Sequence, residues 1–223
     1  QRREKKMEVK YTIKPNQPYK IRNIENTFAS DFRIDSLLQG RYGYSQTLLK
    51  KGDLFDIDVL DSERQRITTF LRRRGFYKFN KEYITFSADS SVGDHEVDLK
   101  ILLKPYKEVL ADGTEVEKEH PLYTVRNINI TTYNGSTINA SNSGPLDTLV
   151  YNDRITIFSN GRPLLKPRNL EEDLRIIPGM IYSDFLVERT YSRFNSLGIL
   201  RQSNIRFEDL HNGKNELDCD IVL

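Results

Sequence analysis

The sequence lacks several features that would assign it to a common class of protein. Its 223 residues include no tryptophan and a single cysteine, Cys219, so an intramolecular disulfide framework is excluded. No run reaches the roughly 18 apolar residues of a membrane-spanning helix. The 34 basic and 32 acidic side chains leave a formal net charge of +2, and this balance argues against nucleic acid as a partner.

Catalytic and metal-binding motifs are also missing. The sequence has no glycine-rich phosphate loop, nucleophile elbow or paired-cysteine motif. Its three histidines, His95, His120 and His211, are dispersed near predicted turns without neighbouring ligands, so no metal site is expected. No pattern places acidic pairs such as Glu171 and Glu172 in one pocket. We therefore expect no catalytic residue, no metal and no cofactor, and we predict that the protein is not an enzyme.

The sequence does contain a short segment that occurs twice in similar form. The segment Tyr19–Ile24 reads YKIRNI, and the segment Tyr123–Ile128 reads YTVRNI. A match of this length is weak on its own, because short strands resemble one another by chance. A true repeat requires that the elements after each copy also match.

The first copy is followed by a regular series of elements. A short helix is expected around Asp31–Gln39, and a glycine-containing turn at Lys51–Phe55. The next segment carries apolar residues at helical spacing on one face, namely Leu60, Ile67, Phe70 and Leu71. Gly75 follows, where a left-handed residue typically ends a helix. Two alternating strands, Glu82–Asp89 and Val97–Leu103, complete the series.

The second copy shows the same series. The turn Pro178–Tyr182 precedes a helix that Gly198 ends. The apolar face of this helix consists of Val187, Tyr191, Phe194 and Leu197. A strand around Ile205 follows, and the last strand is Leu217–Leu223. Cys219 alternates with polar residues in this last strand, so we expect it to be a small buried side chain.

Each copy therefore predicts the order strand, helix, helix, strand, strand. The expected fold class is α+β, with each unit a small mixed three-stranded sheet that carries two helices on one face. This order, with G-x-x-[FY] before the second helix, resembles the POTRA domain, the polypeptide-transport-associated domain of outer-membrane assembly and translocation proteins. The segments Gly179–Leu200 and Leu217–Leu223 are most similar to the translocation-and-assembly-module branch of that superfamily.

The resemblance divides the chain into tandem units. Residues 18–104 and 121–223 are expected to form POTRA-like domains, joined by a linker at 105–120 that allows limited bending. Residues 1–17 are expected to hold the terminal strand of a preceding repeat. The second domain carries an insertion of about residues 133–170, which is predicted to add a hairpin.

The resemblance also implies a function. POTRA domains precede a C-terminal transmembrane barrel, so the full-length protein is expected in the outer membrane of a Gram-negative cell with these domains on its periplasmic side. The expected role is a non-enzymatic scaffold for protein assembly or translocation. Its expected partners are unfolded outer-membrane protein clients, periplasmic chaperones or accessory subunits. The alternatives are a dedicated secretion or cell-division POTRA protein and, more distantly, an unrelated α+β enzyme.

The POTRA order further implies a binding edge. The strand after the long helix has one partner only, so its other side is open to an extended client that adds to the sheet by β-augmentation. The candidate residues are Glu82, Tyr83, Ile84, Thr85, Phe86 and Ser87 in the first domain, and Asn204, Ile205, Arg206 and Phe207 in the second. The first set is favoured because it is richer in β-forming residues.

A basic run, Arg72–Arg74, ends the long helix of the first unit. It is expected to remain solvated and to complement the negative end of the helix dipole, with phosphate or lipid headgroups as the alternative partners. Exposed Arg72 and Arg73 are expected to guide acidic or amphipathic clients towards the neighbouring edge strand.

Overall fold

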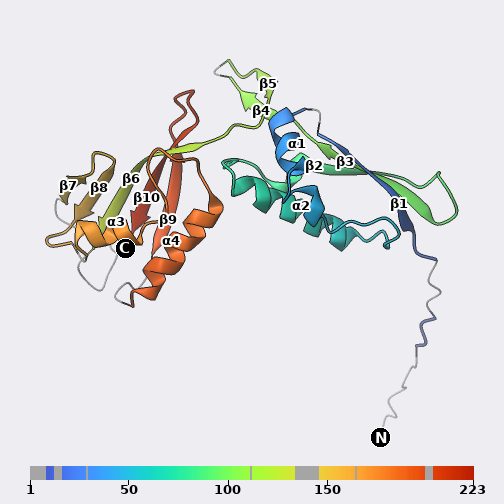
Figure 1. The fold of residues 1–223 in the computed structure, drawn as a ribbon, viewed down its shortest axis with the longest axis horizontal. Helices are drawn as coiled ribbons and strands as arrows, with labels where there is room; N and C mark the ends of the chain where they lie inside the picture. Colours follow the sequence, from blue (N-terminus) through green and yellow to red (C-terminus); the bar gives the residue numbers. More distant parts are fainter. Residues whose placement is uncertain are drawn as a thin grey trace, which may run out of the picture.

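The computed structural model describes residues 9–12, 17–28, 30–110, 112–133, 146–163, 165–198 and 203–223. Within them the chain forms two α+β lobes that lie next to each other along the long axis of the molecule (Figure 1). Each lobe has its own sheet and its own hydrophobic core. None of the helices in these ranges has the length and apolar character needed to cross a membrane. The exact domain bounds stay a prediction.

The first lobe is a mixed three-stranded sheet with its helices on one face (Figure 1). Its elements are β1 (Lys20–Thr27), α1 (Phe32–Gln39), α2 (Ile57–Arg72), β2 (Ile84–Asp89) and β3 (Glu96–Leu103), with the 3-10 turns η1 (Tyr44–Gln46) and η2 (Lys81–Tyr83). The strand order is β1-β3-β2, with β1 parallel and β2 antiparallel to β3. This is the predicted β-α-α-β-β fold.

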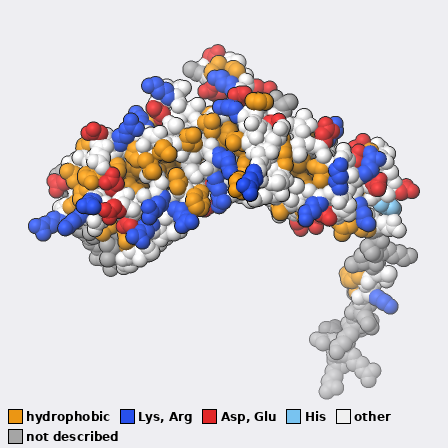
Figure 2. All heavy atoms as spheres, viewed as in Figure 1, with side chains coloured by type: hydrophobic (Ala, Val, Ile, Leu, Met, Phe, Trp, Pro, Cys, Tyr) orange, Lys and Arg blue, Asp and Glu red, His pale blue; other side chains and the backbone are white. Residues whose placement is uncertain are grey.

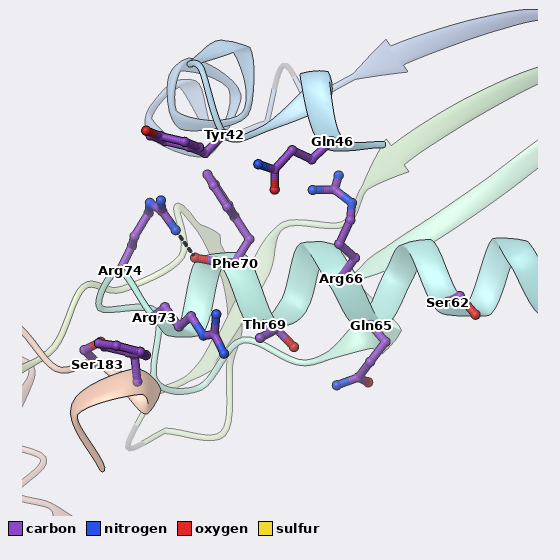
Figure 3. A pocket seen from close by; sticks show the side chains of 11 residues that line it. Tyr42, Gln46, Ser62, Gln65, Arg66, Thr69, Phe70, Arg73, Arg74 and Ser183 are labelled. Atoms are coloured by element: carbon purple, nitrogen blue, oxygen red, sulfur yellow. Dashed lines mark hydrogen bonds between the residues drawn. The ribbon is translucent and has the colours of Figure 1, made fainter. Parts of the chain in front are cut away.

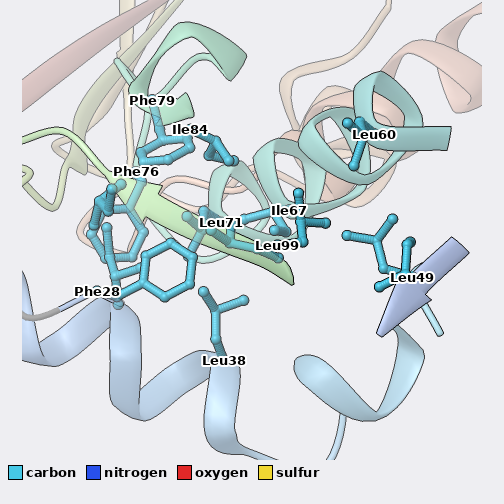
Figure 4. Close-up of a cluster of buried hydrophobic side chains, with 14 of the residues drawn as sticks. Phe28, Leu38, Leu49, Leu60, Ile67, Leu71, Phe76, Phe79, Ile84 and Leu99 are labelled. Carbon is cyan, nitrogen blue, oxygen red and sulfur yellow. The ribbon is translucent and has the colours of Figure 1, made fainter. Parts of the chain in front are cut away.

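The core of this lobe lies between the sheet and the helices. Leu60, Ile67 and Leu71 fall on one face of α2 because their spacing follows the helical period, and all three are buried. They pack with side chains from other elements, such as Phe28 and Leu99 (Figure 4). Full burial of each aliphatic side chain contributes about 1.5–3 kcal/mol, so this face sets how α2 lies on the sheet.

The second lobe repeats this order with a hairpin inserted. Its elements are β6 (Thr124–Thr132), β7 (Asp147–Tyr151), β8 (Ile155–Ser159), α3 (Pro167–Asp173), α4 (Asp184–Ser196), β9 (Asn204–Asp209) and β10 (Glu216–Val222). The strand order is β7-β8-β6-β10-β9, so the predicted hairpin extends the sheet beyond β6. Cys219 lies in the central strand β10 and is fully buried, as predicted.

The two glycine turns match in their hydrogen bonds. The N–H of Gly52 donates to Ile21 O at 2.7 Å, and the N–H of Gly179 donates to Val125 O at 2.6 Å. The φ angles of these glycines are +89° and +84°, a left-handed conformation that favours glycine. Each turn therefore fastens the chain before the long helix to the first strand of its lobe.

The arginine of the repeated hexapeptide has the same role in both lobes. Arg22 and Arg126 lie where the register of the parallel strands shifts, so each is the extra residue of a bulge. Arg22 contacts Asp98 through two hydrogen bonds of 2.8 and 2.6 Å. Arg126 contacts Asp218 through two bonds of 3.0 and 2.7 Å. This shared ion pair gives a structural reason for the similarity between the two hexapeptides.

The expected linker at 105–120 is a hairpin and not an irregular connection. It consists of β4 (Tyr106–Val109) and β5 (Glu115–Lys118), which pair antiparallel. The end of the hairpin is fixed to the first lobe, because the N–H of His120 donates to Asp31 Oδ2 at 2.8 Å. The ring of His120 packs edge-on against Tyr83, with 4.5 Å between ring centroids, and burial lowers its pKa below the ordinary value.

The two lobes meet through an aromatic cluster, and limited bending of the linker stays a prediction. Tyr77, which follows α2, lies among three rings of the second lobe. Its centroid lies 4.9 Å from that of Tyr182, 5.6 Å from that of Tyr123 and 6.0 Å from that of Phe207. Aromatic pairs contribute about 0.5–1.5 kcal/mol each beyond the area they bury, so bending at this joint would break several favourable contacts.

Polar contacts surround this aromatic cluster. The N–H of Tyr123 donates to Gly75 O at 2.9 Å, which joins the two lobes through the backbone. Lys78 Nζ lies 2.5 Å from Asp209 Oδ2, and the Tyr123 hydroxyl donates to the same oxygen at 3.0 Å. Burial would raise the pKa of Asp209, but the hydrogen bond from Lys78 holds it below the usual value. The carboxylate is therefore charged at neutral pH and binds both neighbours.

Candidate client-binding edge

The strand order places both predicted strands at the edge of a sheet. Among the described residues, β2 pairs only with β3, and β9 pairs only with β10. The first strand is shorter than predicted, because Glu82 and Tyr83 belong to η2 and the strand begins at Ile84. The two edges are equivalent in the repeat, but their surroundings differ.

Hydrogen bonding in β2 decides which backbone groups face outward. The N–H of Lys104 donates to Tyr83 O at 2.8 Å. Hydrogen-bonded pairs alternate along an antiparallel ladder, so Thr85 and Ser87 direct their N–H and C=O groups towards β3. Phe86 and Ala88 lie between these positions and direct their backbone groups away from the sheet.

The outward groups of β2 are available over a short stretch. The N–H of Ile84 is already used, because it donates to Lys81 O in the η2 turn. Within the described part of the chain, β2 has no strand partner besides β3, which leaves the N–H groups of Phe86 and Ala88 open. The Ile84 side chain is buried and fixes the strand to the core, whereas Ala88 is exposed. The edge is thus rigid at one end and accessible at the other.

Helix α2 flanks this edge with one basic side chain. The Arg64 guanidinium lies over the Phe86 ring at 5.2 Å from the ring centroid. Lys81 forms an ion pair with Asp61 at 3.1 Å, on the same side of the lobe. These charges lie beside the outward groups of β2, where an added strand would pass.

Two tyrosines cap the equivalent edge in the second lobe. The N–H of Ile205 donates to the Tyr191 hydroxyl at 2.8 Å, and the Tyr77 hydroxyl donates to Phe207 O at 3.4 Å. Leu210 N donates to Glu216 O, so these two residues form a hydrogen-bonded pair of the ladder between β9 and β10. Hydrogen-bonded pairs alternate along the strand, and the backbone groups of Ile205 and Phe207 therefore face away from β10. The hydroxyls therefore take positions that an added strand would need on β9.

Arg72 was expected to be an exposed guide for clients, but its side chain is partly buried in an ion pair. Its Nε lies 2.6 Å from Asp184 Oδ2, and its Nη2 donates to Asp184 Oδ1 at 3.1 Å. This bidentate pair joins the end of α2 to the start of α4. Arg73 stays more exposed, with Glu188 of the second lobe 3.6 Å away. Guidance by Arg73 stays a prediction.

The contacts of Tyr77 and Tyr191 with β9 were not predicted from the sequence. No sequence pattern near Tyr77 indicates its contact with β9, because its partner Phe207 is 130 positions away. Tyr191 had a weak signal. At the same distance before the helix-ending glycine, α2 carries the short side chain of Thr68, which cannot reach the edge of its sheet. A comparison of the two helices position by position would have indicated this difference.

Comparison with known proteins rests on structure alone, because no family model and no curated protein matches the sequence. A BamA structure from Haemophilus ducreyi lacking POTRA domains 1–3 has a TM-score of 0.56 at 15% identity, over 92% of this chain and 29% of that one. POTRA domains 3–5 of Haemophilus influenzae BamA have a TM-score of 0.49 at 15% identity, over 92% of this chain and 61% of that one. POTRA domains 1–2 of Omp85 from Anabaena have a TM-score of 0.41 at 10% identity, over 93% of this chain and 97% of that one.

The likeness to the Haemophilus ducreyi structure shows the fold. The two lobes have a POTRA-type fold, each with the mixed sheet and paired helices described above. It spans 61% of the Haemophilus influenzae chain and 29% of the Haemophilus ducreyi chain.

Proposed function

We propose that this chain is the periplasmic, non-enzymatic scaffold region of an outer-membrane protein assembly or translocation factor. In this proposal it receives extended client chains at β2 of the first lobe. The observation that carries the proposal is the pair of open backbone N–H groups at Phe86 and Ala88. The fold supports the assignment, since the chain is similar in structure to BamA from Haemophilus ducreyi lacking POTRA domains 1–3.

β-Augmentation at this edge suits a general assembly factor. Main-chain hydrogen bonds supply the contact, so one edge accepts many client sequences. Unfolded outer-membrane proteins are expected clients, because their strands alternate apolar and polar residues. Periplasmic chaperones or accessory subunits are the further partners, and a C-terminal transmembrane barrel in the full-length protein would receive the clients.

Replacing Ala88 with proline tests the edge directly. Ala88→Pro removes an outward N–H without removing a ladder bond to β3, so peptide binding should weaken while the fold persists. The measurement is an NMR titration of the amide resonances with a synthetic strand peptide of alternating apolar residues. We expect shifts at residues 84–89 in the wild type and a loss of affinity of about fivefold or more in the variant, because one net hydrogen bond contributes about 1 kcal/mol.

The matched control is Ala88→Val, which adds a side chain but keeps the N–H group. It should bind the peptide as the wild type does. Shifts that leave residues 84–89 untouched and appear on another surface would show that β2 is not the client-binding edge.

A further inference from the structure

A separate groove opens where the two lobes meet. Helix α2, the segment after α1 and the start of α4 border an open groove of about 700 Å³ (Figure 3). The groove is lined by Tyr42, Gln46, Ser62, Gln65, Arg66, Thr69, Phe70, Arg73, Arg74, Ser183 and Phe185. It draws residues from both lobes, and its lining residues differ from those of the β2 edge.

The charge of this groove is entirely positive. Three of its lining residues are arginines and none is acidic. Arg66 is neutralised by Glu63, which accepts two hydrogen bonds of 2.8 and 2.7 Å from its guanidinium. Arg73 has only the looser contact with Glu188 at 3.6 Å. Arg74 has no carboxylate within ion-pair distance in the described part of the chain.

Arg74 is held in place without a counter-charge. Its guanidinium lies 3.6 Å from the centroid of the Phe70 ring, and its Nη1 donates to Phe70 O at 2.9 Å (Figure 3). Burial and the nearby charge of Arg73 lower its pKa, so the charged form is less favourable here than in water. An anion near Arg73 and Arg74 would relieve this repulsion.

The fold itself does not require these charges. In the second lobe, the positions before the helix-ending Gly198 hold Asn195, Ser196 and Leu197, where the first lobe has Arg72–Arg74 before Gly75. Arg72 has a close carboxylate partner in Asp184, whereas Arg73 has only the looser contact with Glu188 and Arg74 contacts Phe70 without a carboxylate. The α4 helix thus ends in the same fold without them.

Apolar surface lies beside the arginines. Tyr42 and Phe185 are exposed. The Phe70 side chain points from α2 towards Tyr42 and forms part of the groove wall (Figure 3). The Arg73 guanidinium lies over Phe185 at 5.6 Å from its centroid. The groove therefore combines positive charge with aromatic contact area.

We propose that this groove binds an acidic segment of a partner protein, with a carboxylate near Arg73 and Arg74 and an apolar side chain against Phe70 and Tyr42. Charge complementarity and aromatic surface favour a ligand that is both acidic and apolar. A flat anionic membrane fits less well, because Arg74 lies along the Phe70 ring in a concave site and does not project outward. The proposed site is independent of client binding at β2.

The test uses two short peptides that differ only in charge. The probe is acetyl-EFEE-amide, and its matched control is acetyl-QFQQ-amide. We expect the acidic peptide to shift the amide resonances of the groove residues, with an affinity that falls as salt rises. The Arg74→Gln variant should bind it about fivefold more weakly, the scale of a partly exposed ion pair.

Arg64→Gln is the control variant, because Arg64 is also on α2 but flanks β2. It should leave binding of the acidic peptide unchanged. If Arg74→Gln unfolds, Tyr42→Ala provides a second test of the same groove and should also weaken binding.

Two results would overturn the proposal. One is equal binding of the two peptides, or binding that neither groove variant affects. The other is binding to vesicles containing phosphatidylglycerol that depends on Arg74, together with no response to the acidic peptide. The second result would assign the groove to a lipid surface. Neither result concerns the β2 edge, so the two proposals fail separately.

Discussion

The edge strands of the two lobes hold the same place in the repeat, yet one is open and the other is capped. In β2 the outward N–H groups of Phe86 and Ala88 lack a partner strand in the described structure. In β9 the outward groups of Ile205 and Phe207 contact the hydroxyls of Tyr191 and Tyr77. One cap comes from the lobe's own helix and the other from the neighbouring lobe.

This difference shows how tandem packing can specialise copies of one fold. The first lobe contributes Tyr77 to the joint and so covers an edge of the second lobe, while its own edge strand lacks such a cap. The inserted hairpin β7–β8 extends the second sheet next to β6, so β7 forms its other edge. Of the two equivalent edges, β2 lacks the caps found on β9 and is therefore the better place for an added strand.

The largest expected effect comes from the glycine that ends each long helix. A Cβ added at Gly75 would lie 2.6 Å from Ile181 Cγ2 and 2.8 Å from Leu122 Cδ2, at a φ of +104°. Gly75→Ala should therefore lower the free energy of unfolding by about 2–4 kcal/mol, through backbone strain and crowding at the joint. Urea unfolding is the measurement.

Gly198→Ala is the matched control in the other lobe. Its φ is +66°, and a Cβ there meets nothing within 4 Å, so only strain of about 1–2 kcal/mol is expected. Equal losses for the two variants would mean that the joint does not crowd Gly75.

The next effect concerns the ion pair across the joint. Arg72→Gln leaves Asp184 without its bidentate partner, and both side chains are partly buried. We expect a loss of about 1–2 kcal/mol and a wider range of lobe orientations, because charge-assisted bonds to partly buried groups are stronger than surface pairs. Urea unfolding and solution scattering would measure the two effects.

Arg73→Gln serves as the comparison for this variant. Its contact with Glu188 is exposed, so a change of less than about 0.5 kcal/mol is expected. A rigid joint in Arg72→Gln would show that the aromatic cluster alone fixes the two lobes.

A smaller change should open the capped edge. Tyr191→Phe removes the hydroxyl that accepts from Ile205 N–H, at a cost of about 1 kcal/mol. Hydrogen exchange at Ile205 should then become faster, and strand peptides should begin to shift residues 204–207. Tyr42→Phe, which removes an exposed hydroxyl far from β9, should change neither observation. Unchanged exchange at Ile205 would contradict the capping role of Tyr191.

The smallest expected effect depends on pH. Burial lowers the pKa of His120 from its ordinary 6.5, so the folded protein keeps this ring neutral. Below about pH 6.5 the unfolded chain binds a proton that the folded protein does not, and stability therefore falls as the pH falls. His120→Gln should flatten this dependence between pH 7.5 and 5.5 in urea unfolding, whereas His211→Gln, at an exposed position, should not. An unchanged slope in His120→Gln would rule out His120 as its source.

Much of the fold was predictable because it depends on local spacing. The helical face of Leu60, Ile67 and Leu71 and the alternation around Cys219 both survive in the structure. The start of β2 was misplaced, because η2 takes up Glu82 and Tyr83 through a turn that hydrophobic alternation does not indicate. The pairing of β4 with β5 inside the linker was not predicted, because the charges of Glu115–Lys118 suit an exposed hairpin as well as an irregular segment.

The candidate site was predictable only as far as strand order. That order placed β2 and β9 at sheet edges, but it could not indicate which backbone groups face outward. The distinction needs the ladder register, which the bond from Lys104 N to Tyr83 O establishes. It also needs the caps on β9, one of which comes from the other lobe.

The sequence by itself determined the repeat, the order of its elements and the glycine and arginine positions that recur in both copies. These features depend on side-chain period and on turns and bulges whose signals lie within a few residues. Only the tertiary structure decided that Arg72 pairs with Asp184, that Tyr77 covers β9 and that β2 stays open. Those outcomes depend on contacts between residues that are far apart in the sequence, by 112 positions in one pair and 130 in the other. No local pattern encodes how two lobes approach each other.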